Sequence, residues 1–266
     1  MRYRFFVTSG LLMRKITLFD GSSELNRYKI IESIYDGRHA RVLYSGHKSP
    51  QSGMALDDDP ELLFDYNQRF LEMVESARPA SVLLIGGGAF TLPKVLLERF
   101  NDIRVDVVEI DPLLPQLARQ YFDLPDDPRL NIIIGDGRQY IDTCQVSYDM
   151  IIIDAFFKYD ISMPLLDITA VQNYRRCLSE YGIVAINFIA RYHTYKTTLA
   201  HRLVATFQSV FSTVELYPAD HDYHERAEQN LIMVASQQDM ITLDYLQSVP
   251  VSLLFMPDNV ILDGNS

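Results

Sequence analysis

The chain has 266 residues and a formal net charge of −11, a length that suits one large domain or one domain with a small appendage. Its 48% hydrophobic and 22% charged fractions are those of a soluble globular protein, and no apolar run approaches the roughly 20 residues of a membrane helix. The acidic charge argues against nucleic acid as the main partner. Cys144 and Cys177 form no disulfide framework or metal cluster, so we expect buried thiols in a cytoplasmic protein and no metal site.

The first part of the chain, residues 1–58, is predicted to form a small antiparallel β unit. Its segments ITLFDGS, YKIIESIYDG and HARVLYSGH are short and rich in β-formers, and turn residues separate them, which predicts about three strands. The N-terminus MRYRFFVTSGLLMRK has a broken apolar stretch and no small-residue cleavage site, so we do not interpret it as a signal peptide. A linking helix is expected at about 59–76, where the chain opens with Asp-Pro and continues with apolar residues near helical spacing.

From Ala80 onward, apolar strands alternate with helices. Five strands are predicted at SVLLIG, RVDVVEI, LNIIIGD, YDMIIIDA and GIVAINFI, and two more, STVELYP and QNLIMVAS, follow one another without a helix. Nearly apolar strands between helices are typical of a parallel sheet covered on both faces. The predicted fold class is therefore α/β: a seven-stranded, doubly wound, Rossmann-like sheet within residues 59–266, whose last strand runs antiparallel at or near the edge, and the small N-terminal β domain.

A glycine turn and two acidic residues follow the first two strands of this sheet. Gly86, Gly87 and Gly88 allow a ligand to approach the backbone, and the next helix begins with unpaired N–H groups. Glu109 comes 23 residues after Gly86, the offset of an acid that accepts hydrogen bonds from ribose hydroxyls, and Asp111 lies two residues further on. The glycines could also form a plain tight turn. They do not match G-x-G-x-x-G, so a nicotinamide cofactor is not expected.

The next two strands also end in acidic residues. Asp136 and Gly137 follow the third strand, where a carboxylate can accept a hydrogen bond from an adenine amino group, and Asp154 ends the fourth. Each acid could instead be a helix N-cap. Because ligands of doubly wound sheets bind beyond the carboxyl ends of the strands, the four strand ends together favour an adenosyl-type ligand.

Several segments stand in the order and spacing of a known family: VLLIGGG, VVEIDP, DDPRLNIIIGDGRQYI, YDMIIIDAF, CLSEYGIVAINF and the N-terminal RYKIIESIYDGRHARVLYSGHKSPQSG. Over about residues 20–235 the chain resembles the spermidine synthase (polyamine aminopropyltransferase) family and its spermidine-synthase-like relatives. The resemblance implies a class I methyltransferase-type Rossmann domain and a homodimer. It also implies an adenosyl co-substrate, either decarboxylated S-adenosylmethionine or S-adenosylmethionine, with methylthioadenosine as the product, and no tightly bound cofactor.

The resemblance also implies roles for individual residues. Gln51 and Glu109 would hold the ribose, and Asp136 would hold the adenine amino group. Asp154 matches the first acid of the family's D-S-S/T-D catalytic segment, and Tyr66 matches the tyrosine of the family's Tyr-His-Glu.

On the acceptor side the chain departs from the family. Ala89 replaces the acid of G-G-G-D-G-G, which disfavours a ligand carrying a carboxylate, so the exclusion of ordinary S-adenosylmethionine is relaxed. Phe157 replaces the second acid of the catalytic segment, and a phenyl ring cannot act as a base. Asn67 and Gln68 replace the histidine and the glutamate of Tyr-His-Glu. Asp160, in the same loop as Phe157, could substitute for the lost acid or be a solvated loop carboxylate.

Three functions stay open. The first is aminopropyl transfer to a polyamine, in which Asp154, Asp160 and Tyr66 would position and deprotonate the attacking amine. The second is a methyl or aminocarboxypropyl transferase that uses S-adenosylmethionine on another acceptor, which Ala89 favours. The third is a non-catalytic binder of an adenosyl ligand, which the loss of the acid at Phe157 favours.

Overall fold

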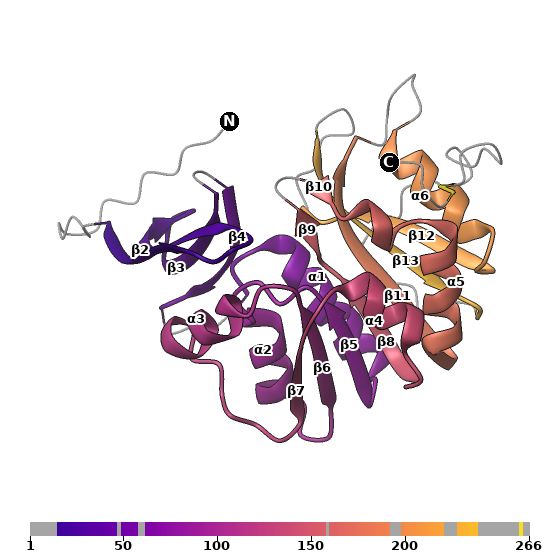
Figure 1. Cartoon of the computed structure of the whole chain (residues 1–266), viewed down its shortest axis with the longest axis horizontal. Helices are drawn as coiled ribbons and strands as arrows, with labels where there is room; N and C mark the ends of the chain where they lie inside the picture. The colour runs from indigo at the N-terminus through magenta and orange to yellow at the C-terminus, as the bar shows by residue number, and fades with distance from the viewer. Residues whose placement is uncertain are drawn as a thin grey trace.

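A computed structural model describes the chain at residues 15–46, 49–57, 62–157, 160–191, 198–220, 228–238 and 261–262. Figure 1 shows a small sheet, drawn in indigo, beside a larger α/β body. Both predicted parts therefore have a counterpart in the structure, and the boundary expected at residue 58 lies outside the described residues.

The small sheet has four antiparallel strands, one more than the sequence predicts. In sheet order they are β1 (Ile16–Ser22), β2 (Arg27–Tyr35), β3 (Arg38–Ser45) and β4 (Ser49–Ala55). The strand that sequence analysis missed is β4, because Pro50 and Gly53 are poor strand formers. It lies at the edge of the sheet, where a proline is tolerated, and its pairing with β3 shifts register beside Pro50.

The large sheet has the seven strands that the sequence predicts. They are β5 (Ser81–Ile85), β6 (Arg104–Glu109), β7 (Leu130–Ile134), β8 (Tyr148–Ile153), β11 (Leu178–Ala190), β12 (Thr213–Pro218) and β13 (Gln229–Ser236). Their order is β12-β13-β11-β8-β5-β6-β7, and β13 runs antiparallel to both of its neighbours. The predicted antiparallel final strand is confirmed, and it lies second from the edge because β12 covers it.

The helices cover both faces of this sheet, as expected for a doubly wound fold (Figure 1). They are α1 (Asp65–Ala77), α2 (Thr91–Arg99), α3 (Leu113–Tyr121), α4 (Gly137–Thr143), α5 (Ile168–Cys177) and α6 (Leu199–Gln208). Between β8 and α5 lie the short strands β9 (Phe156–Phe157) and β10 (Asp160–Ile161) and the 3-10 turn η1 (Met163–Leu165). The linking helix begins at Asp65, later than the predicted residue 59, and residues 58–61 lie outside the described part of the chain.

Two hydrophobic cores explain why the strands of the large sheet are apolar on both sides. In β8, Ile151 and Ile153 pack with α4, α5 and α6, whereas Met150 and Ile152 pack with α1, α2 and α3. All four side chains are fully buried, which is typical of a strand inside a covered parallel sheet. The second core also includes Tyr28 of the small sheet, so the two parts share one apolar interior.

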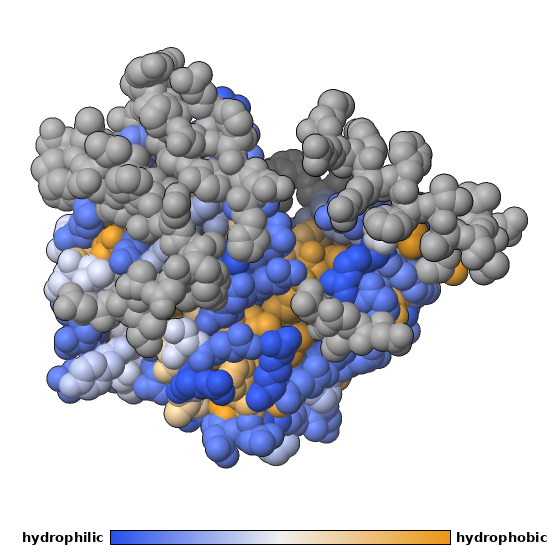
Figure 2. All heavy atoms as spheres, turned by 180° about the vertical axis from the view of Figure 1, so that it is seen from behind, coloured by the Kyte–Doolittle hydropathy of each residue, from blue (hydrophilic) through white to orange (hydrophobic). Residues whose placement is uncertain are grey.

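One face of the molecule combines hydrophilic and apolar residues. Figure 2 shows the face opposite to that of Figure 1, where apolar residues gather in a band near the middle and hydrophilic residues surround them. Within the described residues, none of the helices has the length and apolar character that a membrane crossing requires.

Candidate active site

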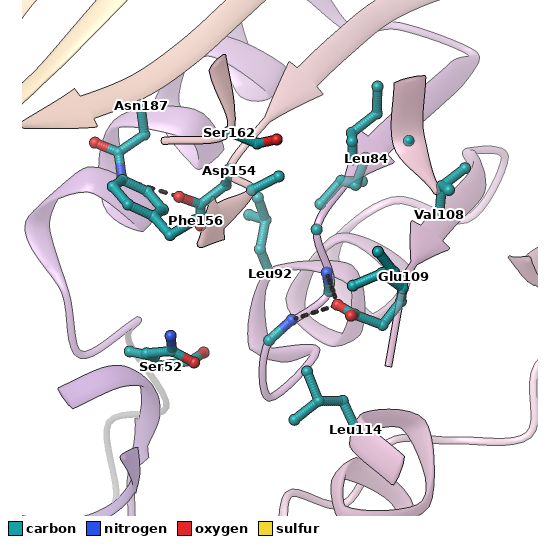
Figure 3. A pocket seen from close by; sticks show the side chains of 18 of the residues that line it. Ser52, Leu84, Leu92, Val108, Glu109, Leu114, Asp154, Phe156, Ser162 and Asn187 are labelled. Carbon is teal, nitrogen blue, oxygen red and sulfur yellow. Dashed lines mark hydrogen bonds between the residues drawn. The ribbon is translucent and has the colours of Figure 1, made fainter. Parts of the chain in front are cut away.

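A cavity of about 500 Å³ lies at the carboxyl ends of the parallel strands, between the large sheet, the N-terminal sheet and the start of α1. Most of the residues that the sequence predicts for the site line it: Gln51, Tyr66, Gly86, Gly87, Gly88, Glu109, Asp136, Gly137 and Asp154. Figure 3 shows that Asp154 and Glu109 lie on different sides of this space. Asp111 is not among the lining residues, and the side chain of Asp160 lies outside the described structure.

The first glycine turn brings the backbone close to the end of β8. Gly86 has a φ of +99°, and a Cβ there would lie 2.3 Å from the carbonyl oxygen of Asp154. Gly137 is similarly confined, since a Cβ would lie 2.4 Å from Cγ2 of Ile85. Only glycine allows these approaches, which keep the floor of the cavity free of side chains.

After the glycines, the turn directs its next two side chains into the core. Phe90 adopts a left-handed conformation with a φ of 58°, and its fully buried ring packs against Gly87. Ala89 is 2% exposed and is not among the residues that line the cavity. The position where an acid of the resembling family would disfavour a ligand carboxylate is therefore part of the hydrophobic core in this structure.

Glu109 holds the glycine turn through its carboxylate. Its Oε2 accepts a 2.7 Å hydrogen bond from the Gly87 N–H and a longer one from Gly88 (Figure 3). Its Oε1 accepts one from the Asp111 N–H at 2.9 Å. Burial raises the pKa of Glu109, and the three backbone N–H groups oppose that rise. A carboxylate oxygen can accept two hydrogen bonds, so a ligand hydroxyl can bind in addition to the backbone.

Asp111 links the two sheets. Its Oδ2 accepts hydrogen bonds from the hydroxyl groups of Ser23, at 2.5 Å, and Tyr28, at 2.8 Å, and its Oδ1 accepts one from the Leu113 N–H. It is 1% exposed, so these partners satisfy a buried charge. Asp111 is predicted to bind the ligand, but both oxygens of its carboxylate already accept hydrogen bonds from the protein.

Asp136 caps a helix and also lines the cavity. One oxygen of its carboxylate caps α4 by accepting a hydrogen bond from the Gln139 N–H at 3.0 Å, and the residue also lines the cavity. The cap holds the side chain at the end of β7, where the sequence predicts contact with an adenine amino group.

Asp154 is paired with a residue that sequence analysis missed. Its Oδ1 accepts a 2.9 Å hydrogen bond from Nδ2 of Asn187, which lies in β11 and is 1% exposed. Burial raises the pKa of Asp154 to about 6, and the Asn187 bond opposes the rise. The sequence feature that could have identified Asn187 is its single side-chain amide within the otherwise apolar strand GIVAINFI.

Tyr66 lies at the start of α1 and joins this helix to β4. Its hydroxyl donates a 2.7 Å hydrogen bond to the backbone oxygen of Gln51. Burial and the nearby Asp154 carboxylate raise the pKa of Tyr66, so the phenol stays protonated. The rings of Tyr35, Phe64 and Tyr66 follow one another with centroids 5.5 and 6.0 Å apart, and the sequence did not indicate that Tyr35 and Phe64 belong to the site.

The charges around the cavity favour a cationic ligand. Three carboxylic acids line it, Glu109, Asp136 and Asp154. Among the described lining residues the cation is Arg138, whose guanidinium binds the carboxylates of Asp142 and Asp167. In the part of the chain that the structure describes, no group of three potential ligands could hold a metal ion.

The strand order and the position of the cavity define this protein as an α/β protein with a methyltransferase-like fold. A family model for the spermine/spermidine synthase domain matches residues 66–242, and the chain belongs to this family.

Several known proteins are similar in sequence. A polyamine aminopropyltransferase of Chromobacterium violaceum is 28% identical over 183 residues, which cover 68% of this chain and 69% of that protein. The same kind of protein from Vibrio vulnificus is 30% identical over 158 residues, 58% of this chain and 51% of the relative. The mouse eEF1A lysine and N-terminal methyltransferase is 28% identical over 62% of this chain, which corresponds to only 23% of that protein.

Solved structures agree on the fold. A probable spermidine synthase from Corynebacterium glutamicum superposes with a TM-score of 0.76 at 20% identity, covering 94% of this chain and 96% of that one. A spermidine synthase in complex with the transition state analogue AdoDATO gives 0.64 at 22% identity, covering 91% and 77%. The human methyltransferase-like protein 13 in complex with SAH gives 0.54 at 20% identity, covering 71% and 87%. At these identities the likeness establishes the fold alone.

Proposed function

We propose that the protein is a transferase that moves the aminopropyl group of decarboxylated S-adenosylmethionine to an amine, with a polyamine as the acceptor that the resemblance implies. The observation that carries the proposal is the position of Asp154, whose pKa of about 6 suits a base at neutral pH, in the same cavity as the glycine turn and Glu109. A cradle for a nucleoside and a base for an amine are the two parts that this reaction requires.

In the proposed reaction the amine attacks the aminopropyl carbon that is bonded to the sulfonium. The nitrogen–carbon bond forms, the carbon–sulfur bond breaks, and its electron pair stays on the sulfur of neutral methylthioadenosine. Asp154 accepts the proton that the attacking nitrogen releases. Tyr66 would help to orient the amine, since its ring lies near Asp154, and Asp160 stays a predicted catalytic residue on sequence grounds alone.

The nucleoside would bind at the other strand ends. Glu109 and Gln51 would accept hydrogen bonds from the ribose, Asp136 would accept one from the adenine amino group, and the glycine turn with Gly137 would let the ligand approach the backbone. Asp111 would support Glu109 through its N–H instead of contacting the ligand.

The choice of a decarboxylated ligand is supported by the charges of the cavity. Three acidic side chains line the cavity, and among its described lining residues the cation Arg138 is already bound by Asp142 and Asp167, so a carboxylate on the ligand would meet no available cation there. A sulfonium that carries only an ammonium group meets attraction from every acid.

Methyl transfer from S-adenosylmethionine is a second candidate. It is favoured by the similarity of the chain to eEF1A lysine and N-terminal methyltransferases, at 27–28% identity. A non-catalytic binder of an adenosyl ligand is the third outcome that the experiment below must separate.

Calorimetry with decarboxylated and ordinary S-adenosylmethionine, followed by an assay for methylthioadenosine in the presence of putrescine or another amine, distinguishes the candidates. Preference for the decarboxylated ligand and amine-dependent release of methylthioadenosine support the proposal, and Asp154→Asn should retain binding while losing turnover. Preference for ordinary S-adenosylmethionine contradicts it. Binding without turnover on any amine supports the non-catalytic alternative. The homodimer and the cytoplasmic location implied earlier stay predictions, and light scattering of the purified protein tests the first.

A further inference from the structure

Phe156 places an aromatic ring beside the proposed base. It follows Asp154 by two residues, and both residues line the cavity. Figure 3 shows the ring next to the Asp154 carboxylate and to the Asn187 amide that binds it. The ring is half-buried and lines the cavity with part of its surface. It therefore occupies space from which water would otherwise reach the carboxylate.

A short hairpin holds this ring in place. Phe156 in β9 pairs with Ile161 in β10, and the N–H of Ser162 donates a 3.0 Å hydrogen bond to the carbonyl oxygen of Ala155. Ile161 is buried in the core on the α4, α5 and α6 side of the large sheet, and Phe156 packs against that same core. One part of the ring is thus anchored in the apolar interior, while another part lines the cavity.

The pKa of Asp154 depends on how much water reaches its carboxylate. Burial raises this pKa to about 6, and the hydrogen bond from Asn187 opposes the rise. Several other titratable or charged residues line the same cavity, and two more acids lie near one of them. The lining residues are Tyr28, Tyr35, Tyr66, Glu109, Asp136 and Arg138, and the two acids, Asp36 and Asp65, lie near Tyr35.

The charged groups nearest to Asp154 do not account for the strength of this base. Tyr66 stays protonated, because burial and the Asp154 carboxylate raise its pKa. Glu109 lies on a different side of the cavity (Figure 3), and the guanidinium of Arg138 is bound by two other carboxylates. The side chain of Asp160 lies outside the described residues, and the experiment below controls for it with a variant. Apolar cover of the carboxylate is the cause that the described residues support.

We propose that Phe156 is a positioning residue for the transfer reaction, whose ring keeps water away from Asp154 so that this carboxylate can take the proton of the attacking amine. The inference rests on the proposed function and adds a residue that acts through its base. A carboxylate that loses water is less stable in its ionised form, so it binds a proton more strongly. Phe156 forms and breaks no bond, and the proton passes from the nitrogen to Asp154 as before.

Carbon-13 NMR of the aspartate carboxyl groups tests the shielding without any turnover. The Asp154 signal, identified by its loss in Asp154→Asn, should titrate near pH 6 in the wild type. In Phe156→Ala it should titrate about 1 pH unit lower, because water reaches the carboxylate, whereas Phe156→Leu keeps apolar cover and should stay within about 0.3 unit of the wild type. An unchanged midpoint in Phe156→Ala, or an equal shift in Phe156→Leu, overturns the inference.

The same titration in an Asp160→Asn background separates apolar cover from a neighbouring charge. Phe156→Ala should lower the Asp154 midpoint by the same amount in this background, because the ring and not the acid produces the effect. A shift that disappears when Asp160 is replaced overturns the inference.

Turnover gives the second measurement. Phe156→Ala should lower kcat at pH 8 by about threefold or more, since a weaker base accepts the proton less readily, and leave methylthioadenosine binding within about twofold. The control is Phe100→Ala, which removes a half-buried ring that packs against Arg78 at the end of α2, outside the cavity lining. An equal loss of kcat in the control overturns the role of Phe156. A wild type that releases no methylthioadenosine with any amine contradicts the proposed function instead, and the NMR titration still decides whether the ring shields Asp154.

Discussion

The hydroxyl group of Tyr28, in the N-terminal sheet, donates a 2.8 Å hydrogen bond to the buried carboxylate of Asp111, two residues beyond the end of β6. The N–H of Asp111 in turn donates to Glu109, which holds the glycine turn. A continuous chain of hydrogen bonds therefore joins the small sheet to the proposed nucleoside cradle. The position of the small sheet, and with it the wall of the cavity that Tyr28 and Gln51 form, depends on this chain.

Ser23→Ala should weaken nucleoside binding although Ser23 does not line the cavity, because it removes the second hydroxyl donor to Asp111. We expect about fivefold weaker binding of methylthioadenosine, the effect of losing roughly 1 kcal/mol of hydrogen bonding. Ser81→Ala is the control, since its hydroxyl donates to Asp149 at 3.0 Å at the opposite end of the strands. Calorimetry should find binding unchanged in this control. Equal losses in both variants would mean that the effect is one of general stability.

The rate of transfer should rise with pH through about pH 6. The folded protein raises the pKa of Asp154 to about 6, and the group can accept a proton only when it is ionised. Asn187 stabilises the ionised form, so Asn187→Leu should move the midpoint of the pH–rate profile to higher pH. A midpoint that does not move when Asn187 is replaced would show that the group titrating in the pH–rate profile is not Asp154.

Asp154→Asn should stabilise the fold at pH 8 and leave its stability unchanged at about pH 3. The folded-state pKa is raised above the ordinary value of 3.8, so the ionised carboxylate destabilises the folded state as pH rises from about 4 to about 6, and the penalty persists above that range. The gain at pH 8 is at most about 3 kcal/mol, since one pKa unit corresponds to about 1.4 kcal/mol. Urea unfolding at the two pH values measures it, and a loss of stability at pH 8 would contradict the assignment.

Glu109→Gln should weaken methylthioadenosine binding by roughly 10- to 100-fold, which corresponds to about 1–3 kcal/mol. The carboxylate accepts hydrogen bonds through both oxygens, and the amide nitrogen of glutamine would face an N–H donor of Gly87 or Asp111. Glu98→Gln, on the exposed side of α2, is the matched control and should bind normally. Normal binding of methylthioadenosine by Glu109→Gln would show that Glu109 does not contribute to nucleoside binding.

Ala89→Asp, which restores the acid of the resembling family, should destabilise the protein instead of changing ligand choice. The side chain is 2% exposed and lies outside the cavity, so the new carboxylate would be buried without a partner, at a cost of roughly 2–5 kcal/mol. Ala89→Val, which adds similar volume without charge, separates the effect of charge from that of crowding. A stable Ala89→Asp variant that excludes S-adenosylmethionine would show that residue 89 faces the ligand.

The strand-end residues could be found from sequence because they follow apolar strands whose carboxyl ends share one edge. Glu109, Asp136 and Asp154 are recognisable in this way, and all three line the cavity. Asp111 follows the same strand as Glu109, but its side chain binds the N-terminal sheet instead. Spacing along a strand end cannot distinguish a side chain that faces a ligand from one that faces another part of the protein.

The amino-acid sequence by itself determined the α/β class, the seven strands of the large sheet and the edge where the cavity lies, because alternating apolar strands and helices are a local pattern that allows few packings. The tertiary structure alone decided which groups line the cavity together with Asp154. Asn187 comes from β11, Tyr35 from β2 and Phe64 from the segment before α1, and these elements are far apart in the chain. They line one cavity only because the N-terminal sheet lies at the carboxyl ends of the large sheet, and in that cavity the amide of Asn187 donates a hydrogen bond to Asp154.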